Sequence, residues 1–193
     1  QPKWKEIWSS LGTPLSDPSE EKARRKLLHR AWNAKNRHPK EPDKACRHKC
    51  GVASESMIHM LTCQRVKHLW SACLEIAEEL FPAEDHKGAE APSTTDDPLM
   101  AIIFNSNANG LYNEPARAFL RHAVGAMYAE ATKTEKEGTT FLWQRALLNA
   151  LHNFRNAVIK WAVEIKRMYI ARKHTYLTER VDRKTYSKYP WLI

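Results

Sequence analysis

The residues with evident chemistry in this sequence lie in one short stretch. It contains four metal donors, Cys46, Cys50, His59 and Cys63, in the spacing Cys-x3-Cys-x8-His-x3-Cys. Two close pairs of thiolate and imidazole donors suit the tetrahedral shell that structural zinc prefers. Since the protein would fill all positions, none is left for a reacting water. The spacing predicts a structural Zn2+ ion; a disulfide and incidental free thiols are the alternatives.

The cysteine count indicates the expected redox environment. The chain has 4 cysteines in 193 residues, which is few for a disulfide framework. Cys73 falls on an apolar helical stripe and is predicted to be a small buried residue outside the metal shell. We therefore expect an intracellular, reducing compartment, with the mitochondrial matrix or another organelle and the nucleus or cytoplasm as alternatives. No apolar run is long enough to span a bilayer. The chain begins at Gln1, as expected of a processed protein or of a segment of a larger one.

The elements that must position the donors are predicted to be helices. A capping pattern at Asp17-Pro18-Ser19-Glu20 predicts a helix to about Asn36, with a basic outer side formed by Lys22, Arg24, Arg25, Lys26 and Arg30. Cys46 and Cys50 are expected on a tight turn at Gly51. His59 and Cys63 are expected on one face of a helix that either continues from Met57 or restarts near Gln64. An apolar stripe then extends to Phe81.

Two helices are predicted in the C-terminal half, from Asn113 to about Thr132 and from Thr139 to about His174. The second carries a heptad-like seam, and we expect this seam to face a partner helix, with neighbouring protein subunits as the partners. The seam consists of Leu147, Leu151, Phe154, Val158, Trp161, Ile165 and Met168.

The predicted fold class is mainly α, an irregular helical domain stapled by a Cys-Cys-His-Cys zinc knuckle, with a long C-terminal helix and a basic tail. Five regions are expected along the chain. They are a docking segment at 1–16, a helix and knuckle at 17–81, an acidic loop region at 82–113, a helical hairpin at 114–175 and a basic aromatic tail at 176–193.

Charge is distributed unevenly along the chain. The formal net charge is +9, and both ends are basic whereas the middle is acidic. This asymmetry favours RNA or DNA as a partner for the basic ends, with an acidic protein or a merely solvated surface as alternatives. The C-terminal candidates for phosphate contact are Lys166, Arg167, Arg172, Lys173, Arg180, Arg183, Lys184 and Lys188, interleaved with aromatic residues that could stack on bases.

The metal-donor stretch also resembles a known family. Cys46, Cys50-Gly51, Glu55-Ser56, His59, Leu61, Cys63 and Trp70 resemble the zinc-binding region downstream of the polymerase domain in reverse transcriptases of non-LTR (LINE-like) retroelements. The resemblance covers about residues 27–70. The gap between the first cysteines is longer, and the gap between His59 and Cys63 shorter, than is common in that family. The resemblance implies contact with template RNA or target DNA, with Lys44, Arg47, His48 and Lys49 as candidate phosphate contacts, in agreement with their charge.

Motifs of enzymes are missing from the sequence. It contains no Tyr/Phe-x-Asp-Asp polymerase pair, no Gly-rich phosphate loop, and no Asp/Glu-x-Lys nuclease arrangement in a strand context. We therefore expect a non-catalytic, zinc-containing, RNA-binding structural subunit of a larger ribonucleoprotein such as an organellar ribosome, of retroelement descent. The alternatives are the C-terminal segment of an active reverse transcriptase and a protein-interaction subunit without nucleic-acid contact.

Overall fold

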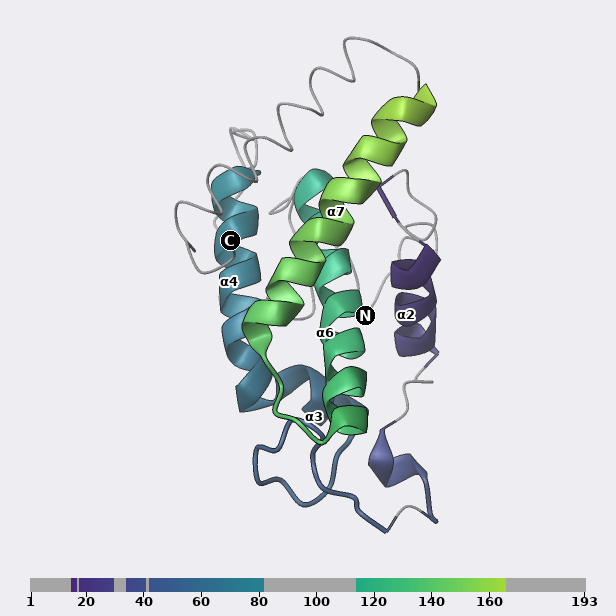
Figure 1. Ribbon diagram of the computed structural model, residues 1–193, viewed down its shortest axis with the longest axis vertical. Coiled ribbons are helices and arrows are strands. Elements are labelled where there is room, and N and C mark those ends of the chain that lie inside the picture. Colours follow the sequence, from purple (N-terminus) through teal and green to yellow (C-terminus); the bar gives the residue numbers. More distant parts are fainter. Residues whose placement is uncertain (1–14, 17, 30–33, 41, 82–113, 166–193) are drawn as a thin grey trace, which may run out of the picture.

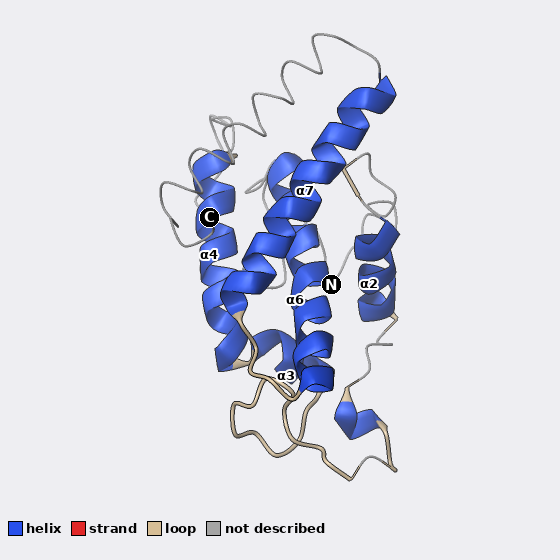
Figure 2. Ribbon diagram, in the orientation of Figure 1, coloured by secondary structure: helices blue, strands red, loops and turns tan. Residues whose placement is uncertain are grey.

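The computed structural model describes residues 15–16, 18–29, 34–40, 42–81 and 114–165. These ranges contain α2 (Pro18–Leu28), the 3-10 helix η1 (Lys35–Arg37), α3 (Met57–Thr62), α4 (Gln64–Leu80), α6 (Glu114–Glu137) and α7 (Trp143–Ile165) (Figure 1). No strand occurs within them (Figure 2). The predicted all-helical fold is confirmed for this part of the chain. None of its helices combines the length and apolarity needed to cross a bilayer.

The central element is α6, which contacts α2, α4 and α7. In Figure 1 it lies between α4 and α2, and α7 crosses over it. Helices that are surrounded in this way carry buried residues on most sides, and α6 buries Phe119, Val124 and Met127 together with five alanines. Phe154 of α7 joins the layers, because its ring meets those of Phe81 and Phe119 edge to face. One core therefore holds all four longer helices.

The seam of α7 is buried inside the chain. Leu147 and Val158 are at most 1% exposed, and Leu151 and Phe154 are also buried, because this face packs on α6 and α4. The predicted heptad-like seam is confirmed over these residues, but its assignment to neighbouring subunits was wrong, since the partner helices belong to the same chain. The seam positions Ile165 and Met168 lie outside the residues whose side chains are described.

The α6–α7 corner follows from its turn residues. Gly138 has a φ of 65°, its N–H donates to Glu135, and Thr139 N–H donates to the carbonyl of Thr134. This pair of bonds is the Schellman arrangement that closes helix ends on a left-handed glycine. The chain turns between the two predicted helices, but α6 continues to Glu137 rather than ending at about Thr132, and α7 begins at Trp143 rather than at Thr139.

The helix predicted from Asp17 to Asn36 is shorter in the structure. α2 ends at Leu28, and Ala34 is extended, with φ −83° and ψ 132°. The backbone N–H groups of Lys35 and Asn36 donate to the Glu55 carboxylate and carbonyl, at 3.3 and 3.1 Å. Hydrogen bonds to a distant segment thus replace the local helical bonds.

Arg24 was predicted on the basic outer side of this helix but is fully buried. Its Nε lies 3.8 Å from Glu20 Oε1, and both side chains lie at the interface of α2 with α6. Burial raises the pKa of Glu20 to about 7, although the charge of Arg24 opposes this rise. Burial also lowers the pKa of Arg24 to about 10, so at neutral pH the guanidinium remains charged.

The raised pKa of Glu20 predicts a pH-dependent stability. The folded chain holds the proton more tightly than the unfolded chain, whose carboxyl has a pKa of 4.5. The stabilisation is therefore complete below about pH 4.5 and is lost as the pH rises through about 7. At about 1.4 kcal/mol per pKa unit, the loss is on the order of 3 kcal/mol. Urea denaturation at about pH 5 and about pH 8 should show a smaller pH-dependent loss for Glu20→Gln than for the wild type; an equal loss in both would contradict the assignment.

Candidate metal centre

Local backbone geometry brings the four donors together. Cys46 and Cys50 lie on a loop in which Cys46 N–H donates to Val52 and Lys49 N–H donates to Cys46. The loop requires positive φ angles at Lys49 (53°) and Gly51 (92°). His59 lies on α3, whose N-cap Ser56 accepts from the His59 N–H. Cys63 lies between α3 and α4, and its carbonyl accepts from Val66 and Lys67. The helix predicted around His59 and Cys63 thus ends at Thr62 and restarts at Gln64.

The donor atoms form one compact group. The donor atoms of Cys46, Cys50, His59 and Cys63 lie within 4.8 Å of one another and could hold a metal ion. The Cys46 and Cys63 sulfurs are 3.9 Å apart, and the Cys50 sulfur is 3.2 Å from His59 Nε2. A tetrahedral zinc shell places two sulfurs about 3.8 Å apart and a sulfur and a nitrogen about 3.6 Å apart. All four cysteines are free thiols, and the donor set therefore fits a closed tetrahedral ion.

Burial makes the thiols of the site harder to deprotonate. Burial raises the pKa of Cys46 to about 12 and also raises that of Cys63. Burial opposes ionisation of Cys50 as well, but hydrogen bonds from the Val52 backbone and the neighbouring thiols hold the pKa of Cys50 below its usual value. Thiolates in such surroundings are stabilised by a bound cation, which is itself the largest local charge.

Cys73 lies outside this group. Its thiol is fully buried in the core, and burial raises its pKa beyond the usual range. The prediction that Cys73 is a buried hydrophobic residue is confirmed. Trp70 packs on the same core and donates from Nε1 to the Leu61 carbonyl at 2.7 Å, which joins α4 to α3 beside the donors.

Arg47 was predicted to contact phosphate, and the structure contradicts this prediction. The residue is 4% exposed. Its Nη2 lies 2.7 Å from Glu55 Oε1, and its Nη1 lies 3.1 Å from Glu135 Oε2 at the end of α6. Burial opposes ionisation of Glu55, but the hydrogen bonds and charge of Arg47 outweigh it, and the pKa of Glu55 lies below its usual value. Arg47 thus joins the metal-donor segment to α6.

His48 is likewise buried rather than exposed to solvent or phosphate. It is 0% exposed, and its ring meets that of Phe141 edge to face, with centroids 4.8 Å apart. Burial lowers the pKa of His48 to about 4, so the imidazole is neutral at physiological pH. Its role is to pack the loop between Cys46 and Cys50 against the α6–α7 corner.

The two lysines beside the donors remain accessible. Lys49 is exposed and Lys44 half-buried. Their ammonium groups also bind backbone carbonyls, that of Lys49 at Gly138 and that of Lys44 at His38. Of the predicted phosphate-binding residues in the described part of the chain, these two remain accessible to a phosphate. The C-terminal candidates, from Lys166 to Lys188, lie outside the described residues, as do residues 1–14 of the docking segment and all of 82–113.

The residues that carried the family resemblance have structural roles here. Gly51 supplies a positive φ, Glu55 holds Arg47, Ser56 caps α3, and Trp70 bonds the end of α3. We call residues 44–63, with the four donors, the clip. Sequence reasoning named Glu55 only through the resemblance. Its partner Arg47 is eight residues away, a separation that matches neither the helical nor the strand period.

No family model, curated protein or solved structure matches the chain. The fold and site therefore define the class of protein, a helical domain with a candidate Cys3His metal centre.

Proposed function

We propose that the clip binds one structural Zn2+ ion. Zinc is supported by the donor set, because three thiolates and one imidazole favour zinc over the oxygen-seeking cations Mg2+ and Ca2+. A structural role is supported by closure: the four protein donors lie within 4.8 Å of one another, and a tetrahedral shell made of them has no open position for substrate. This closed cluster is the observation that carries the proposal.

We further propose that the chain is a non-catalytic RNA-binding subunit of a larger ribonucleoprotein. The net charge of +9 supports an anionic polymer as the partner. Lys49 and Lys44 place positive charge beside the metal. The resemblance to retroelement reverse transcriptases also favours nucleic acid, although the motif residues described above serve the clip itself, so the charge is the stronger support.

RNA affinity is expected to fall steeply as salt rises. Each phosphate neutralised releases counterions, and for single strands the slope of log affinity against log salt is about −0.7 per contact. Fluorescence anisotropy with a labelled single-stranded RNA, over a series of salt concentrations and with zinc present, measures this slope. Polyglutamate serves as the control competitor, because it carries negative charge without phosphate or bases.

Two results would overturn RNA binding. One is the absence of RNA binding at low salt by a zinc-loaded chain; the other is a flat salt response. Stronger competition by polyglutamate than by unlabelled RNA would instead favour an acidic protein partner. The zinc proposal has its own measurement, namely the metal content of freshly purified, reduced protein, which should be about one zinc ion per chain.

A further inference from the structure

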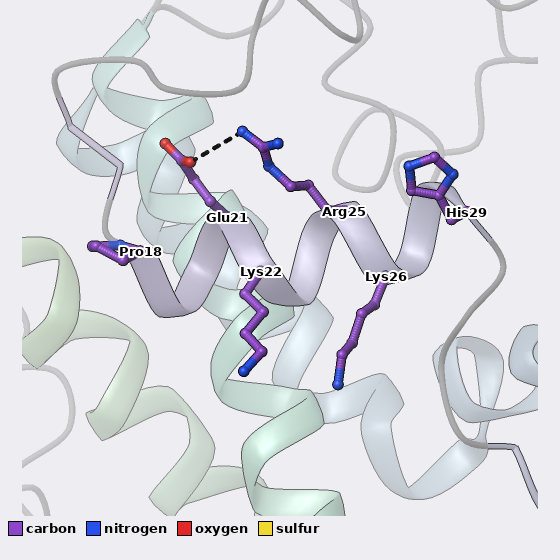
Figure 3. Close-up of a pocket in the computed structure, with 6 residues that line it drawn as sticks. All are labelled: Pro18, Glu21, Lys22, Arg25, Lys26 and His29. Carbon is purple, nitrogen blue, oxygen red and sulfur yellow. Dashed lines mark ion pairs between the residues drawn. The ribbon is translucent and has the colours of Figure 1, made fainter.

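Lys22 and Lys26 are two cationic residues of α2 that lie outside the clip. They lie one turn apart on α2 and line two cavities. One cavity, of about 480 Å³, is lined by α2 and the turn after it; the other, of about 290 Å³, lies between α2, α6 and α7. Figure 3 shows both lysine side chains on one side of α2, with Glu21 and Arg25 on the other. We call the smaller cavity the interhelical groove.

The charges around the groove are suited to an anion. Arg25 is paired with Glu21 at 3.7 Å, whereas neither Lys22 nor Lys26 forms an ion pair with a described residue. Like charges four residues apart on a helix repel one another, and an anion between them would relieve this repulsion. The groove lining also includes Glu20, but this buried carboxyl lies 3.8 Å from the Arg24 guanidinium, which compensates its charge.

The opposite walls of the groove supply groups that can recognise a base. Asn149 and Asn153 of α7 and Tyr128 of α6 line it. Neither asparagine side chain makes a hydrogen bond within the described part of the chain. Each amide has one acceptor oxygen and two donor hydrogens, the combination that pairs with base edges. Tyr128 is half-buried, and an aromatic ring in the lining of a site can stack on a base.

We propose that the interhelical groove holds one nucleotide of a single-stranded RNA, a proposal that rests on the RNA-binding function above. Lys22 and Lys26 bind the phosphate, Asn149 and Asn153 bind the edge of the base, and Tyr128 stacks on it. A volume of about 290 Å³ is at the lower end for small-ligand sites. It suits a single nucleotide unit, and a duplex, whose bases are already paired and stacked, would not enter.

Two pairs of substitutions separate the phosphate contact from the base contact. Lys22→Gln/Lys26→Gln should weaken binding to all RNA sequences and reduce the salt slope by about 0.7, the value for the one phosphate that the two lysines bind together. Asn149→Ala/Asn153→Ala should leave the slope unchanged and reduce the preference among oligo(A), oligo(C), oligo(G) and oligo(U) by roughly fivefold to 100-fold. Both pairs lie at accessible or half-buried positions, and circular dichroism checks that the fold is retained.

The control is Lys67→Gln, which removes an exposed lysine of α4 distant in sequence from the groove-lining residues. Photocrosslinking of 4-thiouridine RNA to the zinc-loaded full chain gives an independent readout, with the crosslink expected at Tyr128 or its neighbours. If the wild type binds RNA and both groove variants bind as it does, the groove proposal is overturned and the RNA-binding proposal stands. If the wild type binds no RNA at low salt, both are overturned.

Discussion

Cys63→Ala is expected to abolish zinc binding and to unfold the clip. Apparent binding energies of structural zinc in small domains are about 10 to 16 kcal/mol, comparable with the whole stability of an ordinary domain. Without the ion, Cys46, whose pKa burial raises to about 12, would remain as a protonated thiol with little to hold the loop. Metal analysis after dialysis should find about one zinc ion per wild-type chain and almost none per variant. Hydrogen exchange should show lost protection over residues 44–63.

The matched control for this substitution is Cys73→Ala. Cys73 is as deeply buried as Cys63 but lies in the α4 core outside the donor group. The Cys73 variant should therefore keep its zinc ion, with a modest loss of stability from the small cavity left behind. Retention of a full zinc ion by Cys63→Ala, or its loss from Cys73→Ala, would show that the ion is not held by the clip.

Arg47→Met is expected to destabilise the fold by about 3 to 5 kcal/mol, the usual cost of removing one partner of a buried ion pair. The substitution leaves the Glu55 carboxylate at 0% exposure, still accepting the backbone N–H groups of Arg47 and Lys35 but without its cation. It also breaks the 3.1 Å link to Glu135. Chemical denaturation of the zinc-loaded chain, followed by circular dichroism, measures the change in the free energy of unfolding.

A double-mutant cycle tests whether the two charges act as a unit. Because an ion pair can often be replaced as a whole at little cost, Arg47→Met/Glu55→Gln should be less destabilising than the sum of the two single substitutions. Lys67→Met, at an exposed position on α4, should change the stability by no more than about 0.5 kcal/mol. An additive cycle, or a loss for Arg47→Met as small as that of the control, would contradict the structural role of Arg47.

Local periodicity was sufficient to predict much of this fold. Residues at helical spacing, such as Val66, Leu69, Cys73 and Ile76 of α4, are all buried, because the period of an amphipathic stripe is a property of neighbouring residues. The donor spacing likewise predicted which four side chains meet. In both cases the interacting residues are close enough in sequence for their pattern to be visible.

The predictions that the structure contradicts failed for a common physical reason, because the residues concerned contact partners that are distant in the sequence. Arg47 and His48 have the composition of a basic surface, yet Glu135 and Phe141, nearly a hundred residues later, complete their burial. Residues 35 and 36, which were predicted to belong to the first helix, likewise donate their backbone N–H groups to Glu55. A single sequence contains no signal for such pairs. The α7 seam was correctly identified, but a heptad pattern alone does not distinguish a helix of the same chain from one of another.

The contacts between the clip and the α6–α7 corner have a thermodynamic consequence for both. Three contacts join the clip to the corner, from Arg47 to Glu135, from His48 to Phe141 and from Lys49 to Gly138. Binding of the proposed ion by the clip and folding of the corner should therefore stabilise each other. Thermodynamic linkage makes this coupling reciprocal. If the bound ion strengthens the packing of the clip on the α6–α7 corner by some factor, that packing strengthens ion binding by the same factor. The affinity of the clip for the proposed ion should therefore depend on the whole helical body, including residues that touch no donor.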